Sequence, residues 1–102
     1  MAVEKVTAAN FDAFLATDAP VLLDFYADWC GPCRMLAPVL ETLAAEIPEL
    51  KIGKINVDEE GALAARFGIS SIPFVARFEN GTLTHSAMGF MPASLLKSKL
   101  GI

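Results

Sequence analysis

Two cysteines, Cys30 and Cys33, are the whole thiol content of this chain of 102 residues. They lie three positions apart in the segment Trp29-Cys30-Gly31-Pro32-Cys33, so a bond between them would close almost no loop and would add little stability. On a helix, side chains at this spacing lie on one side, which brings the two sulfurs close enough to bond. In an intracellular chain such a pair is more typical of catalysis or of metal binding than of a structural bridge.

The pair lies between an apolar run and a helical pattern that begins at Pro32. A thiolate at the start of a helix faces unpaired backbone N–H groups and the positive end of the helix dipole, and both lower its pKa. Proline suits the first helical turn because its missing N–H costs nothing there. We therefore predict that Cys30, at the exposed end of the helix, is the nucleophile and that Cys33 is the resolving thiol.

A metal site is an alternative for these cysteines, because zinc and iron–sulfur sites also use pairs with this spacing. Zinc normally takes four ligands, and here only His85 and carboxylates could complete a set. His85 follows a predicted hairpin turn, where we expect a surface or edge residue. Metal binding and a chance, inert pair remain alternatives, but no metal or bound cofactor is predicted.

The elements that must position the cysteines follow from apolar periodicity and turn residues. Asn80-Gly81 is a strong signal for a two-residue hairpin turn, and the strand–helix–strand order at the front implies a right-handed parallel crossover. Residues 1–102 are therefore predicted to form one α/β domain, with a mixed sheet of four to five strands and helices on both faces. The predicted helices cover 10–15 (capped by Asn10), 32–47, 58–67 (capped by Asp58, ended by Gly68) and 92–101, and the strands 3–6, 21–27, 51–57, 74–79 and 82–88.

Composition and charge exclude several classes of protein. The apolar share is 54%, above the ~45–50% of ordinary soluble domains, so we expect a densely filled core. Eight basic residues stand against twelve acidic ones and are scattered, which argues against nucleic-acid binding. The longest apolar run, 21–27, is far too short to cross a membrane and contains Asp24. The N-terminal MAVEKV lacks the pattern of a secretory signal, so we expect a cytoplasmic protein.

Five segments are distributed along the chain: DFYADWCGPCRMLAP, KINVD, GISSIPF, the NG hairpin and MGF. In this combination they resemble the thioredoxin family, and the resemblance extends over nearly the whole chain. The resemblance implies the thioredoxin fold, a lowered thiol pKa (already known for thioredoxins) and a protein disulfide reductase that acts as a redox carrier. It also implies protein disulfides as substrates, a thioredoxin reductase as recycling partner, and a monomer. A subunit that mainly docks on a larger complex and a thiol oxidant are the rival functions, although Gly-Pro between the cysteines resembles the reducing members.

Asp24 is the third residue to which we assign chemistry. In so apolar a run a carboxyl group is expected to be desolvated, with a raised pKa suited to proton transfer. The resemblance implies that this aspartate relays a proton for the resolving thiol, and that Lys54 is the family lysine beside it. The alternative is a buried ion pair between Asp24 and Lys54 with no catalytic part.

The resemblance also predicts a substrate groove beside the cysteines. It implies a cis bond between Ile72 and Pro73, which would turn the Ile72 backbone outward to bind an extended substrate segment. The predicted lining consists of Trp29, Gly31, Pro32, Ile72, Pro73 and Gly89. Four residues depart from the usual family pattern, namely Tyr26 for a common tryptophan, Phe74 for a threonine, Phe90 for a small residue, and Arg77 within an apolar strand.

Overall fold

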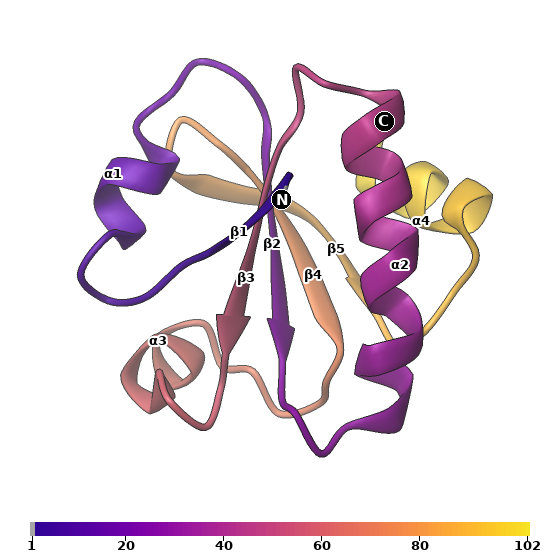
Figure 1. Cartoon of the computed structure of the whole chain (residues 1–102). Coiled ribbons are helices and arrows are strands. Elements are labelled where there is room, and N and C mark those ends of the chain that lie inside the picture. The colour runs from indigo at the N-terminus through magenta and orange to yellow at the C-terminus, as the bar shows by residue number, and fades with distance from the viewer. Residues whose placement is uncertain (1) are drawn as a thin grey trace.

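The computed structural model describes residues 2–102, and its central element is a five-stranded mixed sheet (Figure 1). Met1, which the predicted domain includes, lies outside the described residues. The strand order is β1-β3-β2-β4-β5, so β2 lies in the middle and is buried on both faces. β1 and β3 run parallel to their neighbours, whereas β4 is antiparallel to both β2 and β5. The strands are β1 (Val3–Lys5), β2 (Val21–Tyr26), β3 (Lys51–Asn56), β4 (Phe74–Glu79) and β5 (Thr82–Met88).

Helices cover both faces of the sheet, as the sequence predicts, and two of them lie on each face. Figure 1 shows α2 and α4 on one side and α1 and α3 on the other. Each pair closes its own apolar core, one around Leu36, Leu40 and Leu96 and one around Phe11 and Phe25. The fold class predicted from the sequence is therefore confirmed. The helices are α1 (Phe11–Leu15), α2 (Gly31–Glu46), α3 (Gly61–Arg66) and α4 (Ala93–Leu100).

Of the two predicted helix caps, Asn10 is confirmed in position and Asp58 is wrong. Asn10 does hold the N-cap position of α1, but its side chain accepts a hydrogen bond from the Thr7 backbone N–H instead of capping the helix. Asp58 does not begin α3, because the helix starts only at Gly61 and its N-cap residue is Glu60. Short polar side chains can bond to several nearby backbone groups, so their presence does not fix the first residue of a helix.

Close packing of the sheet against α1 requires a glycine in β3. A Cβ atom on Gly53 would lie 2.6 Å from Val6 Cγ2 and 2.9 Å from the Phe14 ring. Both neighbours are buried in the core under α1, so neither can move aside easily. This strand therefore lies next to α1 at a distance that only glycine permits.

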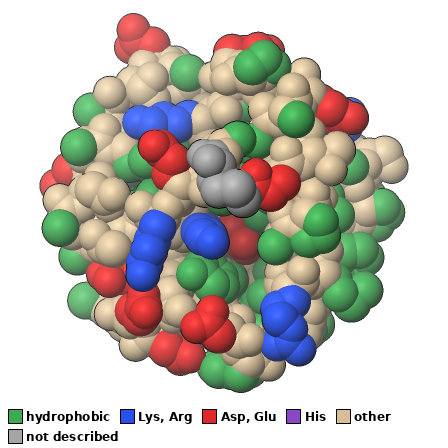
Figure 2. Space-filling model, in the orientation of Figure 1, with side chains coloured by type: hydrophobic (Ala, Val, Ile, Leu, Met, Phe, Trp, Pro, Cys, Tyr) green, Lys and Arg blue, Asp and Glu red, His purple; other side chains and the backbone are tan. Residues whose placement is uncertain are grey.

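The visible surface has no basic stripe. Figure 2 shows blue and red side chains mixed over this face, with green side chains gathered over α2 and α4. Among residues 2–102, none of the helices has the length and apolar character needed to cross a bilayer.

Candidate functional site

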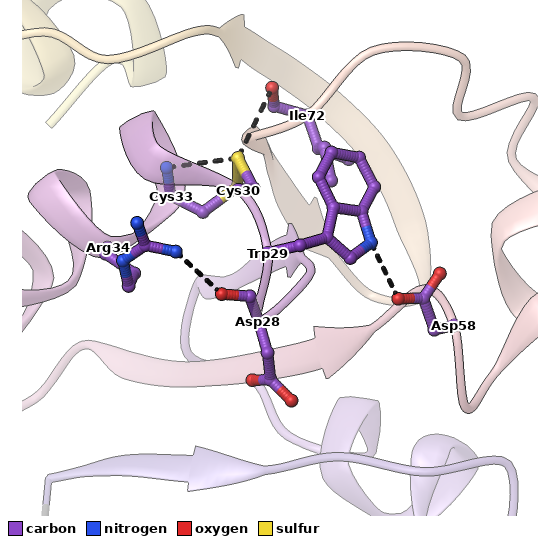
Figure 3. The surroundings of a disulfide bond; sticks show 7 residues. All are labelled: Asp28, Trp29, Cys30, Cys33, Arg34, Asp58 and Ile72. Atoms are coloured by element: carbon purple, nitrogen blue, oxygen red, sulfur yellow. Dashed lines mark hydrogen bonds between the residues drawn. A yellow bond between two sulfur atoms is a disulfide. The ribbon is translucent and has the colours of Figure 1, made fainter.

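The two cysteines form a disulfide at the start of α2. Cys30 is the N-cap residue and Cys33 lies in the first turn, with 5.2 Å between their Cα atoms. The Cys33 backbone N–H donates a hydrogen bond to Cys30 Sγ over 3.2 Å (Figure 3). The sulfur thus occupies the capping position at the positive end of the helix, as the sequence predicts.

The predicted exposure of Cys30 is wrong. The residue is only 4% exposed, almost the same as Cys33 at 3%. Its sulfur lies 4.0 Å from the carbonyl oxygen of Ile72, which covers it from the other side (Figure 3). The sequence places Cys30 at a helix end, but the segment that packs over that end comes from a distant part of the chain.

The residues of the predicted groove come together around this sulfur. The peptide bond between Ile72 and Pro73 is cis, as predicted. The Gly89 N–H donates to the Pro73 carbonyl oxygen over 2.8 Å, which fixes the end of β5 beside the proline. Gly31 and Pro32 form the first turn of α2, and the Trp29 side chain, 70% exposed, projects into solvent next to the disulfide. The predicted lining residues therefore lie close to the sulfur pair, although Pro73 itself is buried.

Asp58, predicted from the sequence as a helix cap, contacts Trp29 instead. Its carboxylate accepts a hydrogen bond of 2.8 Å from the indole Nε1 of Trp29 (Figure 3). Arg34 holds the other flank, since its guanidinium donates to the Asp28 carbonyl oxygen over 2.8 Å. Neither contact has a signal in the sequence, because both join a side chain to a loop whose path only the fold determines.

Asp24 lies in β2 and lines a cavity of about 150 Å³. Cys33 lines the same cavity. The side chain is 4% exposed, and no hydrogen-bond donor within residues 2–102 reaches its Oδ1 atom. Burial raises the pKa of Asp24 to about 7, against a lowering effect of the Lys54 charge. A buried carboxyl group that titrates near neutrality thus shares a cavity with the inner cysteine.

Lys54 is the register partner of Asp24 on β3 and also lines the cavity. No ion pair within 4.0 Å joins the two side chains in the described part of the chain. Instead, Lys54 Nζ lies 5.7 Å from the centre of the Tyr26 ring. The direct Asp24–Lys54 ion pair, considered as an alternative from the sequence, is therefore not formed.

Comparison with known proteins agrees with this geometry. The sequence pattern of the thioredoxin family matches residues 2–101. The chain belongs to the thioredoxin family. It is 46% identical to the thioredoxin of Chlamydia pneumoniae over 94 residues, covering 92% of this chain and 91% of that protein. It is 48% identical to the thioredoxin of Chlamydia caviae over 87 residues, covering 85% and 84%. It is 43% identical to the thioredoxin of Porphyra purpurea over 102 residues, covering 98% and 95%.

Family membership and the bonded pair together support a dithiol–disulfide redox function for Cys30 and Cys33. A metal centre has no comparable support, since no three His, Cys, Asp or Glu side chains of residues 2–102 lie close enough to hold an ion. The thioredoxin fold thus places the redox pair between a helix N-terminus, the Ile72–Pro73 segment and the cavity of Asp24.

Proposed function

We propose that this protein is a thioredoxin-type protein disulfide reductase, a redox carrier that a thioredoxin reductase recharges. The hydrogen bond from the Cys33 N–H to Cys30 Sγ carries the proposal. In the reduced protein the same N–H and the helix dipole stabilise the Cys30 thiolate. Within residues 2–102 no backbone N–H donates to the Cys33 sulfur in this way, so Cys30 is the better nucleophile.

The reaction begins when the Cys30 thiolate attacks one sulfur of a substrate disulfide. A bond forms between Cys30 and that sulfur, the substrate disulfide breaks, and the first substrate thiolate leaves and takes up a proton. Cys33 then attacks Cys30 Sγ, which releases the second substrate thiolate. Two electrons pass to the substrate, and the Cys30–Cys33 disulfide of the present structure is the oxidised product.

Asp24 serves the second step in this proposal. Cys33 must lose its proton before it attacks, and it is buried away from bulk solvent. The shared cavity of about 150 Å³ has room for a few waters at about 30 Å³ each, enough for a proton path to the carboxylate. A base whose pKa lies near the working pH is the most effective one, and the value of about 7 for Asp24 meets that condition. Lys54 acts here through its charge on Asp24.

The surface around Ile72 is the proposed docking site for the substrate chain. An extended segment would lie against the exposed indole of Trp29 and the backbone next to Pro73 and Gly89, where main-chain hydrogen bonds supply affinity without a strict sequence requirement. Such binding suits a reductase of many protein disulfides. A cytoplasmic location and a monomeric state are part of the same proposal.

Trapping of the mixed disulfide tests the assignment of the cysteines. Cys33→Ser is expected to accumulate a covalent complex with a disulfide-bonded protein substrate, because the second step is lost. Cys30→Ser is the matched control and is expected to trap almost none. Trapping by Cys30→Ser alone would reverse the two roles.

A reductase-coupled turnover assay tests the carrier function against the rival function, a docking subunit. With a thioredoxin reductase and NADPH, or ferredoxin for a ferredoxin-dependent enzyme, the protein is expected to reduce a protein disulfide through many cycles. A subunit whose dithiol is secondary would be recharged poorly by either reductase, and that result would contradict the proposal.

A further inference from the structure

Tyr26 is the residue of the Asp24 cavity that the dithiol chemistry leaves unexplained. It stands where thioredoxins commonly carry tryptophan, and its side chain lines the cavity together with Asp24, Cys33 and Lys54. Its ring lies under the Lys54 ammonium group, with 5.7 Å from Nζ to the ring centre. That distance is within the range of about 6 Å in which a cation is attracted to an aromatic face.

Within residues 2–102, Lys54 also lies opposite a carboxylate with which it forms no direct ion pair. Asp24 is directly opposite on the neighbouring strand, where backbones are about 4.8 Å apart, and a lysine has a flexible four-carbon stem. The stem is long enough for a direct ion pair, yet none is formed within 4.0 Å in residues 2–102. The Tyr26 ring is the group that the ammonium contacts instead.

We propose that Tyr26 is a positioning residue: its ring holds the Lys54 ammonium at the side of the cavity and so keeps it from forming a direct ion pair with Asp24. This inference rests on the proposed role of Asp24 in the second step. A salt-bridged carboxylate has a lowered pKa and is a weaker base, so a Lys54 that moved onto Asp24 would slow proton removal from Cys33. The ring thereby keeps Asp24 an effective base for Cys33 at neutral pH.

Among the charged groups around Asp24, Lys54 is the cation that is placed to form an ion pair with it. From α2 the cavity is lined by Arg34, which is bonded to the Asp28 carbonyl oxygen. Asp28 lines the cavity from the loop after β2.

The groups on the remaining sides of Asp24 do not replace Lys54. From β4, the register partner of Asp24 is the apolar Val75. On the outer side of Lys54 lies Lys5 of β1, whose charge is paired with Glu59 at 3.0 Å. Burial raises the pKa of Tyr26 itself, so its ring is neutral at working pH and attracts the cation only through its face.

The test is a titration of Asp24 in the oxidised protein, followed by NMR of its carboxyl carbon. Tyr26→Leu removes the ring, and the midpoint of Asp24 is expected to fall by about one pH unit as Lys54 moves toward it. Tyr26→Phe is the matched control, which keeps the ring and is expected to leave the midpoint where it is. An unchanged or raised midpoint in Tyr26→Leu would overturn the proposal.

A double-mutant cycle with Lys54→Met separates positioning of the lysine from simple exclusion of water. In that background Tyr26→Leu is expected to lose most of its effect on Asp24. If the Asp24 midpoint fell equally with and without the lysine, the ring would act only by excluding water from the cavity, and the proposal would also be overturned. A readout independent of variant stability is the ring-current shift of the Lys54 ε-protons in the unaltered protein, whose absence would again refute the contact.

The kinetic consequence is tested separately from the proposed relay. Tyr26→Leu is expected to slow decay of the mixed disulfide at neutral pH and to leave its formation unchanged. If Asp24→Asn does not slow decay, the relay itself fails, whatever Tyr26 does to the Asp24 titration. If Asp24→Asn slows decay but Tyr26→Leu changes neither the titration nor the decay, the positioning role alone fails.

Discussion

Asp24 makes the stability of the oxidised protein depend on pH in an unusual direction. Burial raises its pKa from 3.8 to about 7 in the folded chain. Between these two values the folded protein binds more protons at this site than the unfolded chain does, so stability falls as pH rises. The cost of the buried carboxylate is absent below about pH 4 and complete above about pH 8.

The size of this cost follows from the same shift. Each pKa unit corresponds to about 1.4 kcal/mol, so the charged carboxylate destabilises the fold by about 4 kcal/mol at most. Asp24→Asn removes the charge and keeps the shape. The variant is therefore expected to be more stable than the parent by up to about 4 kcal/mol above pH 8, and to show almost no gain near pH 4.

Urea unfolding of the oxidised protein at these two pH values measures the effect directly. Asp18→Asn is the matched control, because Asp18 is exposed and its replacement is expected to give the same small change at both values. An equal gain for Asp24→Asn in acid and in alkali, or a loss of stability in alkali, would refute the reasoning.

Two further predictions concern residues away from the cysteines. Gly53→Ala would place a Cβ atom 2.6 Å from Val6 Cγ2 and 2.9 Å from the Phe14 ring. The substitution is therefore expected to lower the free energy of unfolding by about 1–3 kcal/mol. An unchanged urea midpoint would contradict this. Arg77 Nη1 donates a hydrogen bond of 2.8 Å to the Leu100 carbonyl oxygen at the end of α4. Arg77→Leu is therefore expected to lower the free energy of unfolding by about 1–3 kcal/mol and to speed amide exchange in the last turn of α4. Unchanged exchange would show that this hydrogen bond does not stabilise the helix end.

Much of the fold could be predicted because the local signals agree with one another. The continuous apolar run of β2 predicts a central strand, and Asn80-Gly81 predicts the hairpin between β4 and β5, which the structure has. Boundaries were less accurate where a polar side chain had several possible partners. Asp58 is an acceptable helix cap by residue type, but its carboxylate accepts a hydrogen bond from the indole of Trp29 instead. Trp29 is 29 positions away in the sequence.

The site was predictable only as far as its residues carry local chemistry. The spacing of Cys30 and Cys33 predicts a pair that can bond at the start of a helix, and the apolar run around Asp24 predicts a desolvated carboxyl group. Neither prediction needs knowledge of the fold. The burial of Cys30 and the position of Lys54 depend on which segments pack over them. Ile72 comes from 42 positions away to cover the sulfur, and the ring of Tyr26 competes with Asp24 for the lysine, so neither outcome follows from pattern or propensity.

The measurement that most directly tests the central claim is a redox titration of the Cys30–Cys33 pair against glutathione and a reference dithiol. We predict a single two-electron transition that is absent in Cys30→Ser and in Cys33→Ser. Its midpoint is expected to be more negative than that of the glutathione couple, so that electrons flow from this pair to protein disulfides. A midpoint of about −120 mV, as in strong thiol oxidants, or no transition at all, would contradict this claim.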